Sequence, residues 1–143
     1  MGDVVDLAFP VEADLVVLAR LTAAAVAARA EFGVEEVEDL RLAVEELCLP
    51  YLRRGAGGRL HLRFERERGA IEISATLATA GGPGATGSEA APGADSAADR
   101  DDLDEQDELS ARILDALVDE HGRGIVEGQE CRWLRKRRAE NGR

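Results

Sequence analysis

The sequence lacks several features that define whole classes of protein. Only two of its 143 residues are cysteines, and Cys48 and Cys131 lie far apart without metal-type spacing, so neither a zinc site nor a disulfide framework is indicated. It contains no run of 18 apolar residues, and we therefore expect no membrane span. The first ten residues carry acid rather than a basic segment, which argues against a secretory signal. We expect a cytoplasmic protein with one domain over residues 1–143.

Positive charge is also scarce, and it is unevenly distributed. The net charge is −11. Residues 89–108 hold nine acids against one base, a net charge of −8, whereas residues 132–143 hold six bases against one acid, a net charge of +5. Phosphate backbones are bound by broad basic faces, so this balance argues against nucleic acid as a partner. We interpret the acidic run at 99–108 as a solubilising linker, the alternative being mimicry or antagonism of a basic partner surface.

The first third of the chain predicts a strand and two helices. Residues 3–9 alternate loosely, as in a short strand closed by Pro10. Residues 11–32 predict an alanine-rich helix ended by Gly33. A second helix follows, with acids in its first turn, and runs through the stretch DLRLAVEELCLPYLRR at 39–54. We expect the first helix to bury Leu15, Leu18, Leu21, Ala25, Val26 and Phe32, and the second to bury Val37, Leu40, Val44, Leu47 and Tyr51, with Leu42 and Leu49 on nearly the opposite side.

The remaining elements follow from alternation and composition. The stretches RLHLRFE and AIEISATL alternate cleanly and predict a hairpin with one buried face. Residues 78–108, rich in Gly, Ala, Pro, Ser and Asp, predict a disordered or mobile acidic loop in the lid region. A third helix at 109–120 and strands at 124–127 and 130–136 complete the pattern. This order predicts an α+β two-layer sandwich, with helices on one face of a mostly antiparallel sheet.

Two stretches of the sequence carry a family resemblance. DLRLAVEELC, at 39–48, resembles a helix of the anti-sigma factor serine kinases, the RsbW and SpoIIAB group of the GHKL (gyrase, Hsp90, histidine kinase, MutL) ATPase superfamily. SARILDALVDEH, at 110–121, is similar to the family's last helix, and Arg20 matches a position where the family commonly has arginine. The resemblance implies a histidine kinase-like ATPase (Bergerat-type) fold, and phosphoryl transfer from ATP to a serine of an anti-anti-sigma protein.

Two of the family's catalytic features map onto the second helix. Its catalytic carboxylate matches Glu46, but the asparagine that holds magnesium one turn later is replaced by Pro50. Proline offers no ligand atom, and it lacks the N–H that would bond the carbonyl of Glu46, so we expect it to disturb the helix. The histidine often found one turn further on is replaced by Arg54. We therefore interpret Glu46 as a vestigial catalytic residue, and Pro50 and Arg54 as degenerate magnesium-box positions.

The family's two remaining nucleotide features are also missing. Ala75 or Leu77 stands where an aspartate would read adenine, and no acid occurs between Glu72 and Glu89. The glycine-rich turn that would cradle phosphates corresponds to DEQDELSAR, at 104–112, whose carboxylates would repel a polyphosphate. We therefore expect no cofactor and no bound metal. ATP and magnesium would be required only if the chain is a kinase after all.

Four further side chains have ordinary structural explanations. His61 falls on the exposed side of its predicted strand, and His121 at a helix end would compensate the helix dipole. We expect Trp133 in the core and Cys48 as a small buried hydrophobe. The pair Glu45 and Glu46 would, without the resemblance, be a solvated helix face.

The resemblance leads to three functional hypotheses. The first is an anti-sigma factor that sequesters an alternative RNA polymerase sigma subunit in a stress-related partner-switching pathway. A STAS-type anti-anti-sigma protein would then release the sigma subunit by competition, and the family implies a homodimer. The runner-up is a divergent serine/threonine-protein kinase that uses Glu46. The third is a pseudokinase that heterodimerises with an active paralogue.

Overall fold

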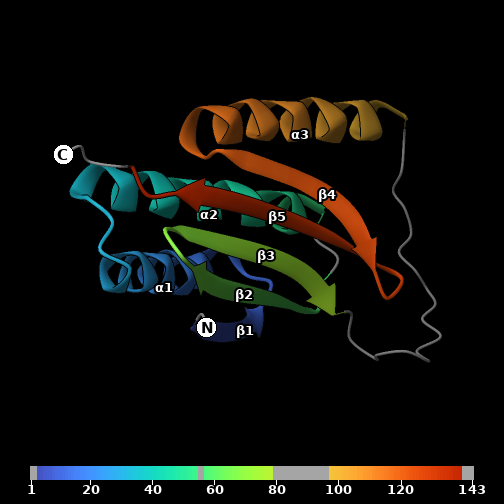
Figure 1. Cartoon of the computed structure of the whole chain (residues 1–143). Helices are drawn as coiled ribbons and strands as arrows, with labels where there is room; N and C mark the ends of the chain where they lie inside the picture. Colours follow the sequence, from blue (N-terminus) through green and yellow to red (C-terminus); the bar gives the residue numbers. More distant parts are fainter. Residues whose placement is uncertain (1–2, 55–56, 79–96, 140–143) are drawn as a thin grey trace.

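A five-stranded antiparallel sheet forms one layer of the molecule (Figure 1). The computed structural model describes residues 3–54, 57–78 and 97–139, of which 97–103 as backbone only. The strands are β1 (Val4–Pro10), β2 (Arg59–Glu67), β3 (Ala70–Ala78), β4 (Glu120–Val126) and β5 (Gln129–Arg137). They lie in the order β1-β2-β3-β5-β4, with each neighbouring pair antiparallel.

The helices form the second layer, with α2 between α1 and α3 (Figure 1). After a short 3₁₀ turn, η1 (Ala13–Leu15), the described part of the chain forms α1 (Val16–Arg29), α2 (Val34–Arg54) and α3 (Ala97–Leu117). The N–H of Gly33 donates to the Glu36 carboxylate at 2.8 Å, which satisfies a free donor at the start of α2. The molecule is therefore the predicted α+β sandwich.

The core lies between the sheet and α2. Alternation directs the apolar side chains of the hairpin toward the helices, and those of Leu60, Leu62, Phe64 and Ile73 are fully buried. The expected stripe of α2 is confirmed, because Leu40, Val44, Leu47 and Tyr51 are buried and Val37 is half-buried. Cys48 is buried as predicted, whereas Leu42 on the far side of α2 is 52% exposed.

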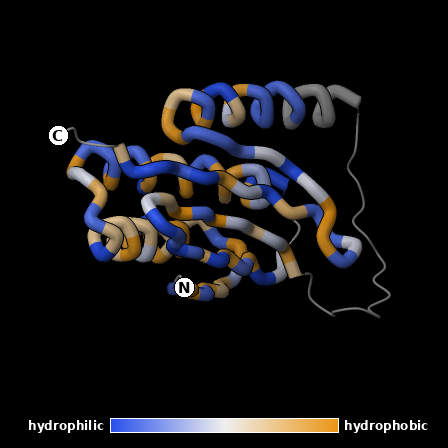
Figure 2. Tube along the Cα trace, viewed as in Figure 1, coloured by the Kyte–Doolittle hydropathy of each residue, from blue (hydrophilic) through white to orange (hydrophobic). Residues whose placement is uncertain are grey.

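The prediction for the buried face of α1 is wrong in part. Val26 and Phe32 are buried as expected and Leu15 is half-buried, but Leu18 and Leu21 are 38% and 58% exposed. In their place the helix buries small or β-branched side chains, those of Val16, Ala19, Ala23 and Ala27. The small alanine side chains allow the backbone of α1 to approach its neighbours closely. Residues around almost the whole circumference of α1 are apolar or weakly polar, as Figure 2 shows, so the helix has no distinct polar face. The hydrophobic pattern therefore could not select a face.

Pro50 lies inside α2 without ending it. The helix continues to Arg54, and the Pro50 ring is fully buried. The expected disturbance is thus limited to the missing donor for the Glu46 carbonyl, while packing of the ring against the core holds the helix together.

The expectation of a loop over 78–108 is wrong for residues 97–108. They form the first half of α3, and residues 79–96 lie outside the described part of the chain. Carboxylates near the start of a helix interact favourably with the positive end of the helix dipole. This interaction stabilises the helical conformation of residues 97–108, whose low apolar content had predicted disorder. An ion-pair cluster around Asp107, described below, also anchors this half of α3.

The last hairpin begins earlier than expected, and this corrects the prediction for His121. Strand β4 starts at Glu120, so His121 is a strand residue, and not a residue at a helix end that compensates the helix dipole. Its Nε2 lies 2.6 Å from Asp115 Oδ1. The prediction of Trp133 in the core is also wrong. Trp133 is only half-buried and points to the sheet face away from the helices, because its neighbours Arg132 and Leu134 point toward them.

His61 is exposed, as expected. Among the described residues, the helices are all too short or too polar to cross a membrane.

Candidate functional site

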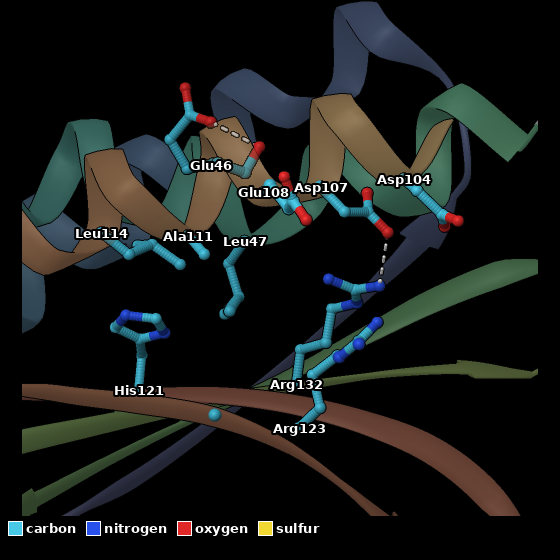
Figure 3. A pocket seen from close by; sticks show the side chains of 12 residues that line it. Glu46, Leu47, Asp104, Asp107, Glu108, Ala111, Leu114, His121, Arg123 and Arg132 are labelled. Atoms are coloured by element: carbon cyan, nitrogen blue, oxygen red, sulfur yellow. Dashed lines mark hydrogen bonds and ion pairs between the residues drawn. The ribbon is translucent and has the colours of Figure 1, made fainter. Parts of the chain in front are cut away.

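A cavity of about 520 Å³ lies between helices α2 and α3 and strands β4 and β5 (Figure 3). Acidic side chains line its helical side, and arginines reach into it from the sheet, as Figure 3 shows for Asp104, Asp107, Arg123 and Arg132. Among the predicted site residues, Glu46 lines this cavity. Its full lining is Glu46, Leu47, Asp104, Asp107, Glu108, Ser110, Ala111, Leu114, His121, Gly122, Arg123 and Arg132.

Glu46 is tied to α3 through a buried hydroxyl group. The Ser110 hydroxyl donates to Glu46 Oε1 at 2.9 Å and accepts from Arg53 Nη1 at 3.3 Å. Ser110 is only 3% exposed, whereas Glu46 and Arg53 are half-buried, so this chain of hydrogen bonds is partly shielded from water. The carboxylate of Glu46, which the sequence predicted at a vestigial catalytic position, is therefore engaged in joining two helices.

A second carboxylate of α3, that of Asp107, lies among three guanidinium groups. Its Oδ2 is 3.0 Å from Arg54 Nη2 and 3.3 Å from Arg132 Nη2, and its Oδ1 is 3.9 Å from Arg53 Nη1. The Asp107 side chain is 13% exposed, so these ion pairs are less screened than surface pairs. Arg54, predicted at a degenerate magnesium-box position, thus binds a carboxylate of the same chain.

Arg132 is the most buried of these three arginines. Its side chain is 9% exposed, and its guanidinium carbon lies 5.8 Å from the centre of the Tyr51 ring. The Tyr51 hydroxyl donates to the Ala75 carbonyl at 3.0 Å, and burial raises the pKa of Tyr51 to about 12. Arg132 Nη2 also lies 3.3 Å from Glu130, while its buried Nε has no hydrogen-bond partner among the described residues.

The residues at the positions where the sequence analysis expected nucleotide ligands do not fit a magnesium-bound nucleotide. The side chain one turn after Glu46 is the buried ring of Pro50, which has no atom to hold a cation. Asp104, Asp107 and Glu108, from the stretch expected to cradle phosphates, line the cavity with carboxylates instead of glycine N–H groups. On β3, Ala75 and Leu77 supply no carboxylate to an adenine amino group.

Several residues of the site were not predicted from the sequence. The sequence analysis placed Asp107 in a linker and Ser110 at the start of a helix. It predicted no role for Arg53 or Arg132. A signal for Arg132 was present, because alternation in its strand places it on the same face as Leu134. Arg20 lies outside the cavity, where its Nη1 pairs with Glu45 Oε1 at 3.1 Å.

Comparison with known proteins identifies the family. The family model of the histidine kinase-like ATPase domain matches residues 9–127. The match spans every described element from the end of β1 through β4, including both helices that line the cavity. No curated protein matches the sequence. From this match and its α+β fold, the chain belongs to the histidine kinase-like ATPase domain family.

Proposed function

We propose that the chain is an anti-sigma regulatory factor that sequesters an alternative sigma factor in a partner-switching pathway, and that it does so without ATP hydrolysis. The observation that carries this proposal is the state of the cavity. Glu46 is hydrogen-bonded to Ser110, and Asp107 is paired with Arg54 and Arg132, so α3 is fastened to α2 and β5 beside the carboxylate expected at the catalytic position. A family fold whose expected reaction site does not fit a nucleotide still has its surfaces available for binding.

The outer side of the helical layer supports a binding role. Leu18 and Leu21 on α1 and Leu42 on α2 are 38%, 58% and 52% exposed. The Arg20–Glu45 ion pair joins the two helices next to these leucines. Exposed apolar side chains rimmed by charge are typical of protein interaction sites. We propose that this surface, defined by Leu18, Leu21 and Leu42, binds the sigma subunit.

Affinity purification of the tagged full-length chain from its own host, with and without stress, tests this function. A sigma subunit should be recovered with the unaltered chain and lost with Leu21→Glu. Val34→Glu is a matched control, because Val34 is 81% exposed at the start of α2, away from this surface. If no sigma subunit is recovered under either condition, the proposal is wrong. In the same system, a STAS-type partner should displace the sigma subunit without becoming phosphorylated.

The kinase alternative is favoured by one observation. Glu46 borders a cavity of about 520 Å³, which is within the range of small-molecule sites. Incubation with labelled ATP, magnesium and a cognate anti-anti-sigma protein decides between the two functions. Transfer of label that is lost in Glu46→Gln would establish the kinase. Absence of transfer from a chain that still binds its sigma subunit would favour sequestration alone.

A further inference from the structure

The three arginines around Asp107 are drawn together from two separated parts of the chain. Arg53 and Arg54 lie in the last turn of α2, and Arg132 lies on β5, facing the helices. Like charges at such short range are costly unless an anion lies between them. The structure supplies that anion from α3, as the Asp107 carboxylate.

A carboxylate does not use all the donors of this cluster. Asp107 Oδ2 receives both short contacts, from Arg54 and Arg132, whereas Arg53 remains 3.9 Å from Oδ1. The Nε of Arg132 is buried without a hydrogen-bond partner among the described residues. An arginine presents five N–H donors in a fixed fork, and buried donors without partners are rare in proteins. The cluster therefore has donor capacity beyond what the Asp107 carboxylate uses.

The charge of the cluster leads to the same conclusion. Among the described residues, the other carboxylate that pairs with this cluster is that of Glu130, at 3.3 Å from Arg132 and 3.8 Å from Arg54. If the Asp107 carboxylate moves away, three guanidinium groups face one carboxylate. An excess of two positive charges suits a doubly charged anion, and arginine forks match phosphate oxygens in geometry.

We propose that Arg53, Arg54 and Arg132 form a binding site for a phosphate group, which Asp107 occupies as an internal competitor. The ligand is inorganic phosphate or the phosphate of a monoester, and it enters when the Asp107 side chain leaves. Because Arg53 also donates to Ser110, which in turn bonds Glu46, the ligand loosens the attachment of α3 to α2. This site does not depend on the sigma-binding function proposed above.

Replacing the internal competitor tests this proposal. Asp107→Asn keeps the size of the side chain and removes its charge, so inorganic phosphate should bind at least tenfold more tightly than to the unaltered chain. Isothermal titration with sodium phosphate gives this ratio, at ionic strength matched with sodium chloride. Asp104→Asn is the matched control, because Asp104 lies one turn earlier on α3, lines the same cavity and has no ion pair among the described residues. It should change phosphate affinity less than twofold.

Three further measurements complete the test. The double variant Asp107→Asn/Arg132→Gln should lose phosphate binding, and sodium acetate should bind Asp107→Asn at least tenfold more weakly than phosphate. Titration with O-phosphoserine distinguishes the sources: tighter binding than inorganic phosphate indicates a monoester, and weaker binding indicates free phosphate. Equal phosphate affinity in Asp107→Asn and the unaltered chain, or binding that survives Arg132→Gln, overturns the proposal.

Hydrogen exchange provides a test that does not require the variants to fold. In the unaltered chain, phosphate should accelerate exchange of the α3 amides around Asp107 and Ser110, whereas sodium chloride of equal ionic strength should not. Unchanged exchange at the highest phosphate concentration would also overturn the proposal.

Discussion

The hydrogen bond between Ser110 and Glu46 makes a quantitative prediction about how α3 is held. Ser110→Ala removes a hydroxyl group that bonds two charged partners, at 2.9 Å to Glu46 and 3.3 Å to Arg53. A hydrogen bond to a charged group contributes about 1.5–3 kcal/mol. Both partners are partly accessible to water, which replaces some of this energy, so we expect the unfolding free energy to fall by about 2 kcal/mol. The corresponding fall in Tm is about 4–8 °C.

A double-mutant cycle isolates the pair itself. Glu46→Gln keeps an acceptor oxygen but removes the charge, and it should cost about 1 kcal/mol in urea unfolding followed by circular dichroism. Its neighbour Glu45 pairs with Arg20 at the surface, so the control Glu45→Gln should cost about 0.5 kcal/mol or less. Ser110→Ala and Glu46→Gln should be non-additive by about 1 kcal/mol. Additivity within about 0.3 kcal/mol would refute the claim that this bond fastens α3 to α2.

Three other perturbations have expected outcomes. Gly122→Ala should lower the unfolding free energy by about 1 kcal/mol, because an added Cβ would lie 3.1–3.2 Å from the Trp133 ring. Gly124→Ala is the control and should not lower it, because an added Cβ there meets nothing within 4 Å. Equal effects of the two variants in urea unfolding would contradict this packing. Burial raises the pKa of Cys48 to about 12 from 9.0, so the stability that the neutral thiol contributes is fully present below pH 9 and is lost as pH rises toward 12. Cys48→Ala should flatten the pH dependence of urea unfolding in that window, and an unchanged slope would show that the thiol is not buried in solution. Pro50→Asn should leave Mg·ATP binding undetectable by calorimetry, because Asp107 and the adenine-reading position are unchanged; binding by this variant would make Pro50 the sole defect.

The sheet and α2 could be predicted because each has a clear hydrophobic period. Strict alternation in β2 and β3 fixes which side chains face the core, and the three- and four-residue spacing of α2 fixes its buried stripe. The resemblance of residues 39–48 to a helix of the anti-sigma factor kinases predicted the histidine kinase-like ATPase fold. The family match over residues 9–127 confirmed this fold. Local patterns of this kind need no knowledge of the neighbouring elements.

The errors arose where tertiary contacts decide the outcome. An almost wholly apolar α1 has no preferred face until α2 and the sheet cover one side. Residues 97–108 have the composition of a linker, but Asp107 meets arginines that are distant in sequence. The glycines of β4 hide the alternation that places His121 in a strand. The ion-pair cluster of the site was invisible for the same reason, because its arginines come from α2 and β5.

The central claim is that the cavity between α2 and α3 is closed to nucleotide. Calorimetric titration of the full-length chain with Mg·ATP and with Mg·ADP tests it most directly, supported by thermal unfolding at high ligand concentration. If the cavity is closed to nucleotide, neither ligand gives a heat of binding or a rise in Tm. Binding in the micromolar range, with a matching rise in Tm, would contradict it and would make the kinase the better description of this chain.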